Sequence, residues 1–534
     1  MNTCVTAEFL TEKYVEEWRV NPTWKMKSFR ARVLTDLGIE VGYGKAWLAR
    51  ARAKLMIYGS ALEQYSRVWD YGKAVLKYNP GSKVYVVVEG VDKPEPPLFL
   101  RMYCCLSALR SGFNKGCRPL IGLDGCHLKG SYPGQILVAV GKDGNNQIFP
   151  FAWATVEVEN KETWGWFLEC LKNDGLLEAF EQLVPMAEKR YCVRHIWANF
   201  KLQYTGSTFK DLFWNAARAT TLFDFEVAME SITFLSEDAY EYLANIPAEH
   251  WSRHAFSDFC KSNMILNNVC ETFNAVIKDA RDKPILTQME WMRKYMMKRN
   301  SKKWDQIQKM EGKNTPYVAK VFERMEKVAR YCIVQLSRGD SYEVELNGDK
   351  VVVDLHQRTC SCYQWQLTGI PGVHAFACIL DKRTNPDDYV DEYYSRATYI
   401  LAYQDAIKPM PGPKHWEKID MPQPLPPPVR VMPGRPKSKK RKLEKGEKGE
   451  GAGQIKEPKA PKTQKRCKNC GQLGHYAKTC GNAPSTQPPP SVAASTSEAK
   501  KGGKPVQNTP WLQEQRRKKA ERAARNVSYM CVLL

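Results

Sequence analysis

RPLIGLDGCHLKGSYPGQILVAVGKDGNNQIFPFAWATVEVENKETWGWFL, residues 118–168, is the stretch that decides the fold. Three short apolar runs, at 119–123, 135–140 and 147–156, are separated by turn-forming residues. This pattern predicts an antiparallel meander of three strands. Apolar residues then recur at helical spacing from Trp164 to Leu171, which predicts an amphipathic helix over 161–172.

The residues before the meander, 1–117, are predicted to be mainly helical. Two short helices flank Gly38, and the second runs from about 43 to 55. This pair is either an αα-hairpin or a helix-turn-helix that reads DNA. The basic residues that would support DNA reading are Lys45, Arg50, Arg52 and Lys54.

The residues after the meander fall into several regions. The pattern is mostly helical from 176 to 330, so we treat 118–330 as one core with a helical part, and strand character returns within 340–385. Prolines dominate a connection over 386–429. Lys, Gly, Pro, Ser and Gln fill 430–465 and 483–534, which are therefore expected to be disordered on either side of a small module at 466–482.

The net charge of +22 is concentrated in the tail. Residues 430–534 hold 25 Lys and Arg against 7 Asp and Glu, a net charge of +18, which leaves only +4 for residues 1–429. A basic tail favours contact with nucleic-acid phosphates, whatever the base sequence. The alternative is a solvated linker that its charge keeps soluble.

The cysteines point to metal binding rather than disulfides. No run approaches the roughly 18 apolar residues that a membrane span needs. The first residues, MNTCVTAEFLTEKY, lack the apolar region of a secretory signal. We therefore expect the 17 cysteines to be thiols or metal ligands.

The small module at 466–482 contains CKNCGQLGHYAKTC, which resembles a retroviral-type zinc knuckle. Its spacing lets three thiolates and one imidazole surround Zn²⁺ as a tetrahedron, and zinc would supply the folding energy of so short a segment. The expected ligands are Cys467, Cys470, His475 and Cys480. Such knuckles grip exposed bases of single-stranded nucleic acid, so Tyr476 is the expected stacking residue, flanked by Lys468 and Lys478.

The linker before the knuckle contains PGRPKSKKRK, residues 433–442. Six of its ten residues are basic, which predicts a nuclear import signal and a nuclear location. Arg435, between Gly434 and Pro436, also resembles the minor-groove arginine of an AT-hook. The other basic residues expected to contact nucleic acid here are Lys439, Lys440, Arg441 and Lys442. A generic basic linker is the alternative.

The segment 353–380 resembles a SWIM-type zinc finger. Cys360, Cys362 and His374 would be three of its ligands. The family pattern asks for a further cysteine two residues before the histidine, where this chain has Gly372. Cys378 is the candidate replacement. A site with three ligands, or with a rebuilt fourth, would bind zinc more weakly, and a small unit without metal is the alternative.

The order of these segments resembles the transposases of plant Mutator-like elements. The resemblance runs from residues 118–168 through RYCVRHIWANF (190–200), NNVCETFN (267–274) and ARDKPIL (280–286) to the SWIM-like segment and the knuckle. It implies the α/β fold class, with an RNase H-like core and a helical insertion. In such enzymes an Asp-Asp-Glu triad holds two divalent metal ions for phosphoryl transfer to or from DNA.

Two members of that triad have counterparts in this chain. Asp124 matches the first carboxylate and Glu271 the third, while Cys192 and His195 match the C-x-x-H signature of the family. The second carboxylate of the family ends a fourth strand, just before a helix that begins Gly-Leu. Here LeuLysAsnAsp (171–174) runs directly into GlyLeuLeuGluAlaPhe (175–180), so the core is expected to lack that strand and its aspartate.

The sequence therefore predicts a transposase-derived protein that binds Zn²⁺ and nucleic acid, with DNA as the main partner, and that is not an enzyme. One alternative is an active transposase in which Asp174 or another carboxylate completes a Mg²⁺ site. Another is an RNA-binding protein that acts through its knuckle. The sequence CysValLeuLeu (531–534) also fits the C-a-a-X pattern for prenylation of Cys531, although the import signal argues against membrane anchoring.

Overall fold

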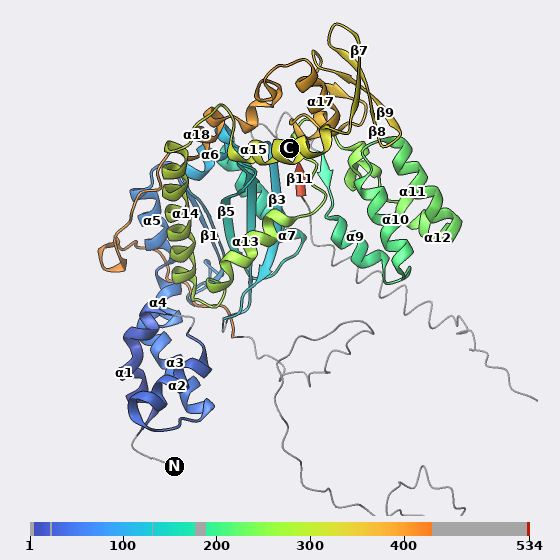
Figure 1. Ribbon diagram of the computed structural model, residues 1–534. Helices are drawn as coiled ribbons and strands as arrows, with labels where there is room; N and C mark the ends of the chain where they lie inside the picture. The colour runs from blue at the N-terminus through green and yellow to red at the C-terminus, as the bar shows by residue number, and fades with distance from the viewer. Residues whose placement is uncertain (1–4, 22–23, 131, 177–187, 430–530, 534) are drawn as a thin grey trace, which may run out of the picture. The chain divides into compact units, whose positions relative to one another are not determined.

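The computed structural model describes residues 5–21, 24–130, 132–176 and 188–429, and the backbone of 531–533. Within these residues the chain is a mixed α/β protein with two antiparallel sheets, one of seven strands and one of four (Figure 1). The predicted fold class is confirmed at the level of α/β.

Three N-terminal helices surround a small core of their own. They are α1 (Ala7–Val20), α2 (Met26–Leu37) and α3 (Tyr43–Tyr58). Trp18 packs against Phe29, with ring centroids 4.4 Å apart. Helix α2 ends at Gly38, whose φ of 65° is a left-handed conformation that glycine adopts without a steric penalty. The predicted pair of helices around Gly38 is confirmed.

The seven-stranded sheet contains the predicted meander. Its strands β3 (Leu120–His127), β4 (Gln135–Lys142) and β5 (Ile148–Val156) pair antiparallel in this order, which confirms the prediction. Strands β1 (Lys83–Glu89) and β2 (Leu98–Cys105) extend the sheet beyond β5. The sheet therefore begins before residue 118, where the predicted core begins. Helices α4 (Ala61–Ser66) and α5 (Val68–Tyr78) precede β1, and α6 (Ser107–Gly116) follows β2.

The other end of the sheet is made by two short strands. These are β6 (Lys189–Arg190) and β11 (Cys531–Leu533), and the full strand order is β1-β2-β5-β4-β3-β11-β6. Strand β11 is antiparallel to both neighbours, and Cys531 is opposite Gly122 of β3 and Arg190 of β6. Strand β3 consequently has a hydrogen-bonded partner on each side.

Helices cover both faces of this sheet. Directly opposed residues of antiparallel strands share a face, so Asp124, Val138 and Trp153 lie on one face. Trp153 donates to the Met289 sulfur of α14 (Ile285–Gln308), and α13 (Asn268–Val276) contacts the same face. Helix α7 (Lys161–Leu171) and the π-helical turn η1 (Lys172–Leu176) lie against the opposite face, where Tyr103 of β2 points.

A helical region lies between β6 and α13. It contains α9 (Val193–Phe200), α10 (Ser207–Arg218), α11 (Leu222–Leu235) and α12 (Glu237–Ala244). Its core is aromatic, and Phe213 stacks on Trp251 with ring centroids 5.5 Å apart. The short 3₁₀ turns within the described residues are η2 (Ala248–His250), η3 (Arg253–Ala255), η4 (Ile277–Asp279), η5 (Pro386–Tyr389), η6 (Glu392–Tyr394) and η7 (Pro413–His415).

The four-stranded sheet follows α15 (Pro316–Ala329). Its order is β10-β9-β8-β7, and its bounds are β7 (Ile333–Arg338), β8 (Ser341–Leu346), β9 (Asp349–Asp354) and β10 (Thr359–Cys360). Helices α16 (Gln364–Thr368) and α17 (Val373–Asp381) follow it. Buried side chains of β8, β9 and α17, including Val344, Val353 and Ile379, form the core of this small module.

Helix α18 (Arg396–Tyr403) packs tightly on α6, although it lies in the segment predicted to be a proline-rich connection. A Cβ atom added at Gly112 or Gly116 of α6 would lie 2.2 Å from a backbone atom of Ala402. The two glycines therefore permit the close approach of the helices. At the end of α18, Tyr403 donates a hydrogen bond of 2.8 Å to the buried carboxylate of Asp143.

Candidate functional site

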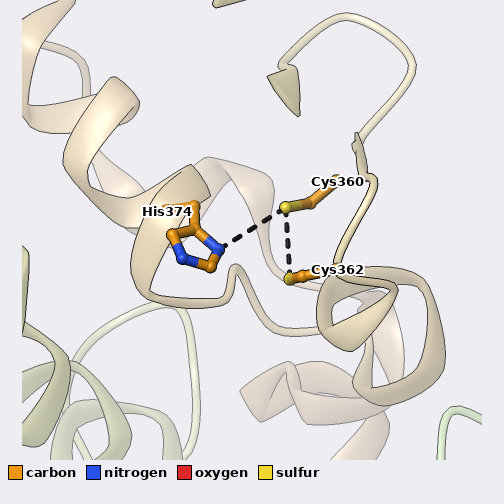
Figure 2. A group of neighbouring side chains, drawn as sticks. All are labelled: Cys360, Cys362 and His374. Atoms are coloured by element: carbon orange, nitrogen blue, oxygen red, sulfur yellow. Dashed lines mark hydrogen bonds between the residues drawn. The ribbon is translucent and has the colours of Figure 1, made fainter. Parts of the chain in front are cut away.

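The small module brings Cys360, Cys362 and His374 together (Figure 2). Cys360 ends β10, which is anchored by the pairing of Cys360 with Val353 of β9. Cys362 lies in the following turn, and His374 lies in the first turn of α17. A left-handed backbone at Tyr363, with φ 63°, reverses the chain so that α16 can begin directly after Cys362.

The spacing of the three side chains suits a single zinc ion. One ligand atom from each lies within 4.8 Å of the others, and among the described residues this is the one group of His, Cys, Asp and Glu side chains with that property. The two sulfurs are 3.2 Å apart, and the Cys360 sulfur is 3.8 Å from Nδ1 of His374. Two sulfurs bound to tetrahedral zinc are roughly 3.7 Å apart, since each Zn–S bond is about 2.3 Å. A shift of about half an ångström would thus admit the metal.

The electrostatics of the group also favour a cation. The hydrogen bond from the Cys360 thiol, together with the nearby His374 ring, lowers the pKa of Cys362 to about 5 despite burial. The same contact raises the pKa of Cys360. The two sulfurs therefore share one proton at neutral pH, and a zinc ion would displace it.

Cys378 is not part of this group, which corrects the expectation that it replaces the missing fourth ligand. It lies one turn after His374 on α17, with no exposed surface, among side chains such as Val344 and Val353. Burial raises the pKa of its thiol to about 12. Its side chain contributes to the module core rather than to the ligand group.

Gly372, at the position where the family pattern has a cysteine, caps the N-terminus of α17. Its backbone is extended, with φ −72° and ψ 176°, which any residue can adopt. A Cβ atom added there would meet only the Cβ of Gln364, at 3.4 Å, within a radius of 4 Å. The backbone at Gly372 therefore tolerates a Cβ atom in ordinary contact with Gln364.

A second group forms around Asp124, on the sheet face that α13 covers. Asn274 of α13 donates a 2.8 Å hydrogen bond to one carboxylate oxygen of Asp124, and the backbone N–H of Gly125 donates to the other. Glu271, one turn earlier on α13, forms an ion pair with Arg194 of α9. Arg194 and Asn274 are not among the predicted site residues, although both lie inside the quoted motifs.

Cys192 and His195 complete this second group. Cys192 is the N-cap of α9, and its sulfur accepts a 3.5 Å hydrogen bond from the backbone N–H of Asn267. Burial opposes ionisation of Cys192, but His195 and that backbone N–H outweigh it and lower the pKa of Cys192. The Cys192 sulfur in turn raises the pKa of His195, as do the nearby carboxylates of Asp124 and Glu271. The four residues selected from the sequence are thus neighbours.

Asp174 lies elsewhere. Its carboxylate accepts hydrogen bonds from Tyr103 of β2, at 2.6 Å, and Tyr85 of β1, at 3.3 Å. The side chain of Tyr103 is on the opposite face of the sheet from that of Asp124, and β5 and β4 separate β2 from β3. Three strand spacings are about 14 Å. Asp174 and Asp124 therefore do not converge on a shared metal ion, which requires ligands a few ångströms apart.

The basic residues of α3 mostly have partners inside the chain. Lys45 donates to the carbonyl of Val5, and Arg52 and Lys54 form ion pairs with Glu8 and Asp282. A helix that reads DNA presents its basic side chains to the groove. The geometry of α3 therefore favours the αα-hairpin over the helix-turn-helix reader.

Several predicted residues lie outside the described residues. These are the knuckle ligands Cys467, Cys470, His475 and Cys480, the neighbouring Tyr476, Lys468 and Lys478, and the linker residues Arg435, Lys439, Lys440, Arg441 and Lys442. Of the C-a-a-X segment, the structure gives only the backbone of residues 531–533 in β11. Prenylation of Cys531 stays a prediction.

Comparison with known proteins gives no match: no family model, curated protein or solved structure is similar to this chain. In the part of the chain that the structure describes, no helix has the length and apolar character needed to cross a membrane.

Burial raises the pKa of Asp124 to about 6, from an ordinary value near 3.9. A carboxyl with a raised folded-state pKa lowers stability as the pH rises from about 4 to about 6. Asp124→Asn should therefore stabilise the chain by about 2 kcal/mol at pH 7.5, with no gain at pH 4. The Asn274 Oδ1 atom, which has no hydrogen-bond partner among the described residues, could accept from the new amide after rotation.

Urea unfolding of both proteins at the two pH values measures this difference. Asp211→Asn, at an exposed position of α10, is the matched control and should change little at either pH. A loss of stability in Asp124→Asn at pH 7.5 would contradict the prediction.

Proposed function

We propose that this chain is a zinc- and nucleic-acid-binding protein derived from a Mutator-like transposase, and that it has no catalytic activity. The convergence of Cys360, Cys362 and His374 carries the zinc part of this proposal. Two thiolates and an imidazole are ligands that zinc prefers, whereas Mg²⁺ and Ca²⁺ prefer oxygen. The role of the metal would be structural, because the ligands join β10, the turn and α17.

The transposase origin and an RNase H-like core are supported by the arrangement around β3. Asp124 lies on a central strand of the sheet, and the helix that carries Glu271 crosses the same face. The absence of activity is supported by the strand on the other side of β3. That strand is β11, and its sequence CysValLeu contains no carboxylate. In the RNase H-like arrangement the second aspartate would come from this position.

Cobalt titration of the full chain tests the zinc assignment, because Co²⁺ takes the same ligands and its thiolate complexes absorb light. We expect two bound ions, one in the small module and one in the knuckle. His374→Ala and Cys360→Ser should each remove one ion, and Cys470→Ser and His475→Ala should remove the other. Two ions in all four variants would refute both assignments.

Nucleic acid is the proposed partner because the tail, residues 430–534, holds +18 of the net charge of +22. Each phosphate contact releases counterions, so binding should weaken steeply with salt. A nuclear location follows from the basic segment at 433–442. Stronger binding to single-stranded RNA than to duplex DNA would instead favour an RNA-binding role for the knuckle.

Glutamine substitutions in the tail should reduce DNA affinity on the order of a hundredfold at about 0.1 M salt, and should flatten its salt dependence. The seven positions are Arg435, Lys439, Lys440, Arg441, Lys442, Lys468 and Lys478. This change keeps the chain length and β11, which a truncation would remove. Fluorescence anisotropy with labelled DNA at several salt concentrations measures the effect.

A control variant carries seven glutamine substitutions at exposed basic residues of α14 and α15 and just after α15. The positions are Lys294, Lys298, Lys302, Lys320, Arg324, Lys327 and Arg330. This variant should bind DNA nearly as well as the unmodified chain. An equal loss in both variants would mean that DNA binding follows the total positive charge rather than the tail.

A further inference from the structure

We infer that the Cys360–Cys362–His374 site holds zinc through three protein ligands and keeps its fourth position for an exchangeable thiolate from outside the module. The inference rests on the proposed zinc function and adds a ligand-binding role to it. Closed structural zinc sites use four protein ligands, whereas sites with three leave a position for water or another ligand.

The site has three protein ligands because neither of the two nearby candidate positions supplies a fourth. Cys378, one turn along α17, is buried in the module core and lies outside the ligand group. Gly372, at the start of the same helix, has no side chain. Among the described residues no fourth His, Cys, Asp or Glu side chain joins the group.

Gly372 lies two residues before His374 in the sequence, at the N-cap of α17. A Cβ atom there would make an ordinary contact with Gln364 and would meet no other atom within 4 Å, so Gly372 can be replaced by a residue with a side chain. Cys362 and His374 are both partly exposed, which leaves a route from solvent to the metal. An incoming ligand of modest size can therefore reach the fourth position without displacement of the core.

The chemical class of the fourth ligand follows from the charge of the zinc site and from the preference of zinc for soft sulfur ligands. Two thiolates and a neutral imidazole balance the two positive charges of zinc, so the resting fourth ligand would be a water molecule. Thiolate is a soft ligand that zinc binds well, and its addition would complete a Cys₃His-type set. In this exchange the thiol loses its proton to solvent, its sulfur bonds to zinc, and the water leaves, without any change of oxidation state.

Cobalt spectroscopy of the full chain tests the inference with 2-mercaptoethanol as the probe. The difference spectrum between the unmodified chain and His374→Ala isolates this site from the knuckle. Added thiol should raise its thiolate-to-cobalt absorption by about half, because the thiolates bound to the metal increase from two to three. Saturation should depend on the thiol concentration and not on the chain concentration. Dependence on the chain concentration would assign the thiolate to a second copy.

Gly372→Cys supplies the fourth ligand from within the chain. It should bind zinc more tightly, on the order of tenfold or more, and should no longer respond to added thiol. Gly372→Ser is the matched control, because it adds a side chain of similar size without a thiolate, and it should keep the response.

The outcomes separate this inference from the proposed function. If His374→Ala leaves the cobalt spectrum unchanged, the module binds no metal, and both the zinc assignment and the exchangeable fourth ligand are wrong. The difference spectrum could be present but fail to respond to thiol, or Gly372→Cys and Gly372→Ser could behave alike. In either case the zinc assignment stands, and only the inference of an exchangeable thiolate at the fourth position is wrong.

Discussion

Replacing His374 with alanine is expected to remove about 4 kcal/mol of zinc-dependent stability from the small module, residues 333–381. This value applies when free zinc is held at about a thousand times its dissociation constant, because only the folded module has the ligands in place. The expected effect is large because His374 is the single ligand that joins α17 to the two cysteines near β10.

Hydrogen exchange of the β8 and β9 amides measures this stability locally, without unfolding the rest of the chain. Zinc should slow their exchange by about a thousandfold in the unmodified chain and should have no effect in His374→Ala. His356→Ala, at an exposed position just after β9, is the matched control and should behave as the unmodified chain. Equal protection by zinc in the two variants would contradict the assignment of His374 as a ligand.

DNA with terminal inverted repeats of the Mutator type is expected to remain uncut by this chain in Mg²⁺ or Mn²⁺. Two-metal phosphoryl transfer needs carboxylates that converge, and here Asp124 and Asp174 are on opposite faces of the sheet. Metal ions contribute several kcal/mol to such transition states, so their loss should slow cleavage by a factor on the order of a thousand or more. Gel analysis of end-labelled DNA measures the rate.

The controls for this prediction are Asp124→Ala and Glu271→Ala. The unmodified chain and the two variants should show the same background rate of DNA cleavage. Metal-dependent cleavage that both substitutions abolish would overturn the prediction.

A gain-of-function variant tests whether the strand beside β3 is the reason that no cleavage is expected. A strand that ends in aspartate would be inserted between Asp174 and Gly175, with residues 531–534 removed because β11 occupies the position beside β3. Cleavage by this variant alone would show that cleavage requires a strand with an aspartate at the position beside β3.

The meander and its neighbours could be predicted because local pattern determines them. Turn-forming residues separate three apolar strands that are buried along most of their length, and the helix over 161–172 shows clear apolar spacing. The predicted limits are therefore close to those of β3, β4, β5 and α7. The pair of helices around Gly38 follows from the same kind of signal. The grouping of Cys360, Cys362 and His374 was predicted from the resemblance of residues 353–380 to a SWIM-type zinc finger.

Other features depend on contacts between residues far apart in the sequence. The local spacing of apolar residues and motifs does not determine such contacts. Cys378 could have faced the metal or the core, and the rotation of α17 on β8 and β9 decides for the core. The face of the sheet that Asp174 reaches depends on its hydrogen bonds to Tyr85 and Tyr103. Strand β11 spans only three residues, too few for any periodicity, and its partners Gly122 and Arg190 are hundreds of residues away.

The contact between α6 and α18 limits how the protein can be divided into fragments. A fragment that stopped at residue 385 would retain the whole meander but would lack Tyr403, leaving a buried oxygen of Asp143 without its phenol donor. An unsatisfied buried group of this kind costs about 1–3 kcal/mol, and more when it is charged. The bare surface around Gly112 and Gly116 would also be exposed to water. A fragment that preserves the packing around the meander must therefore extend past Tyr403.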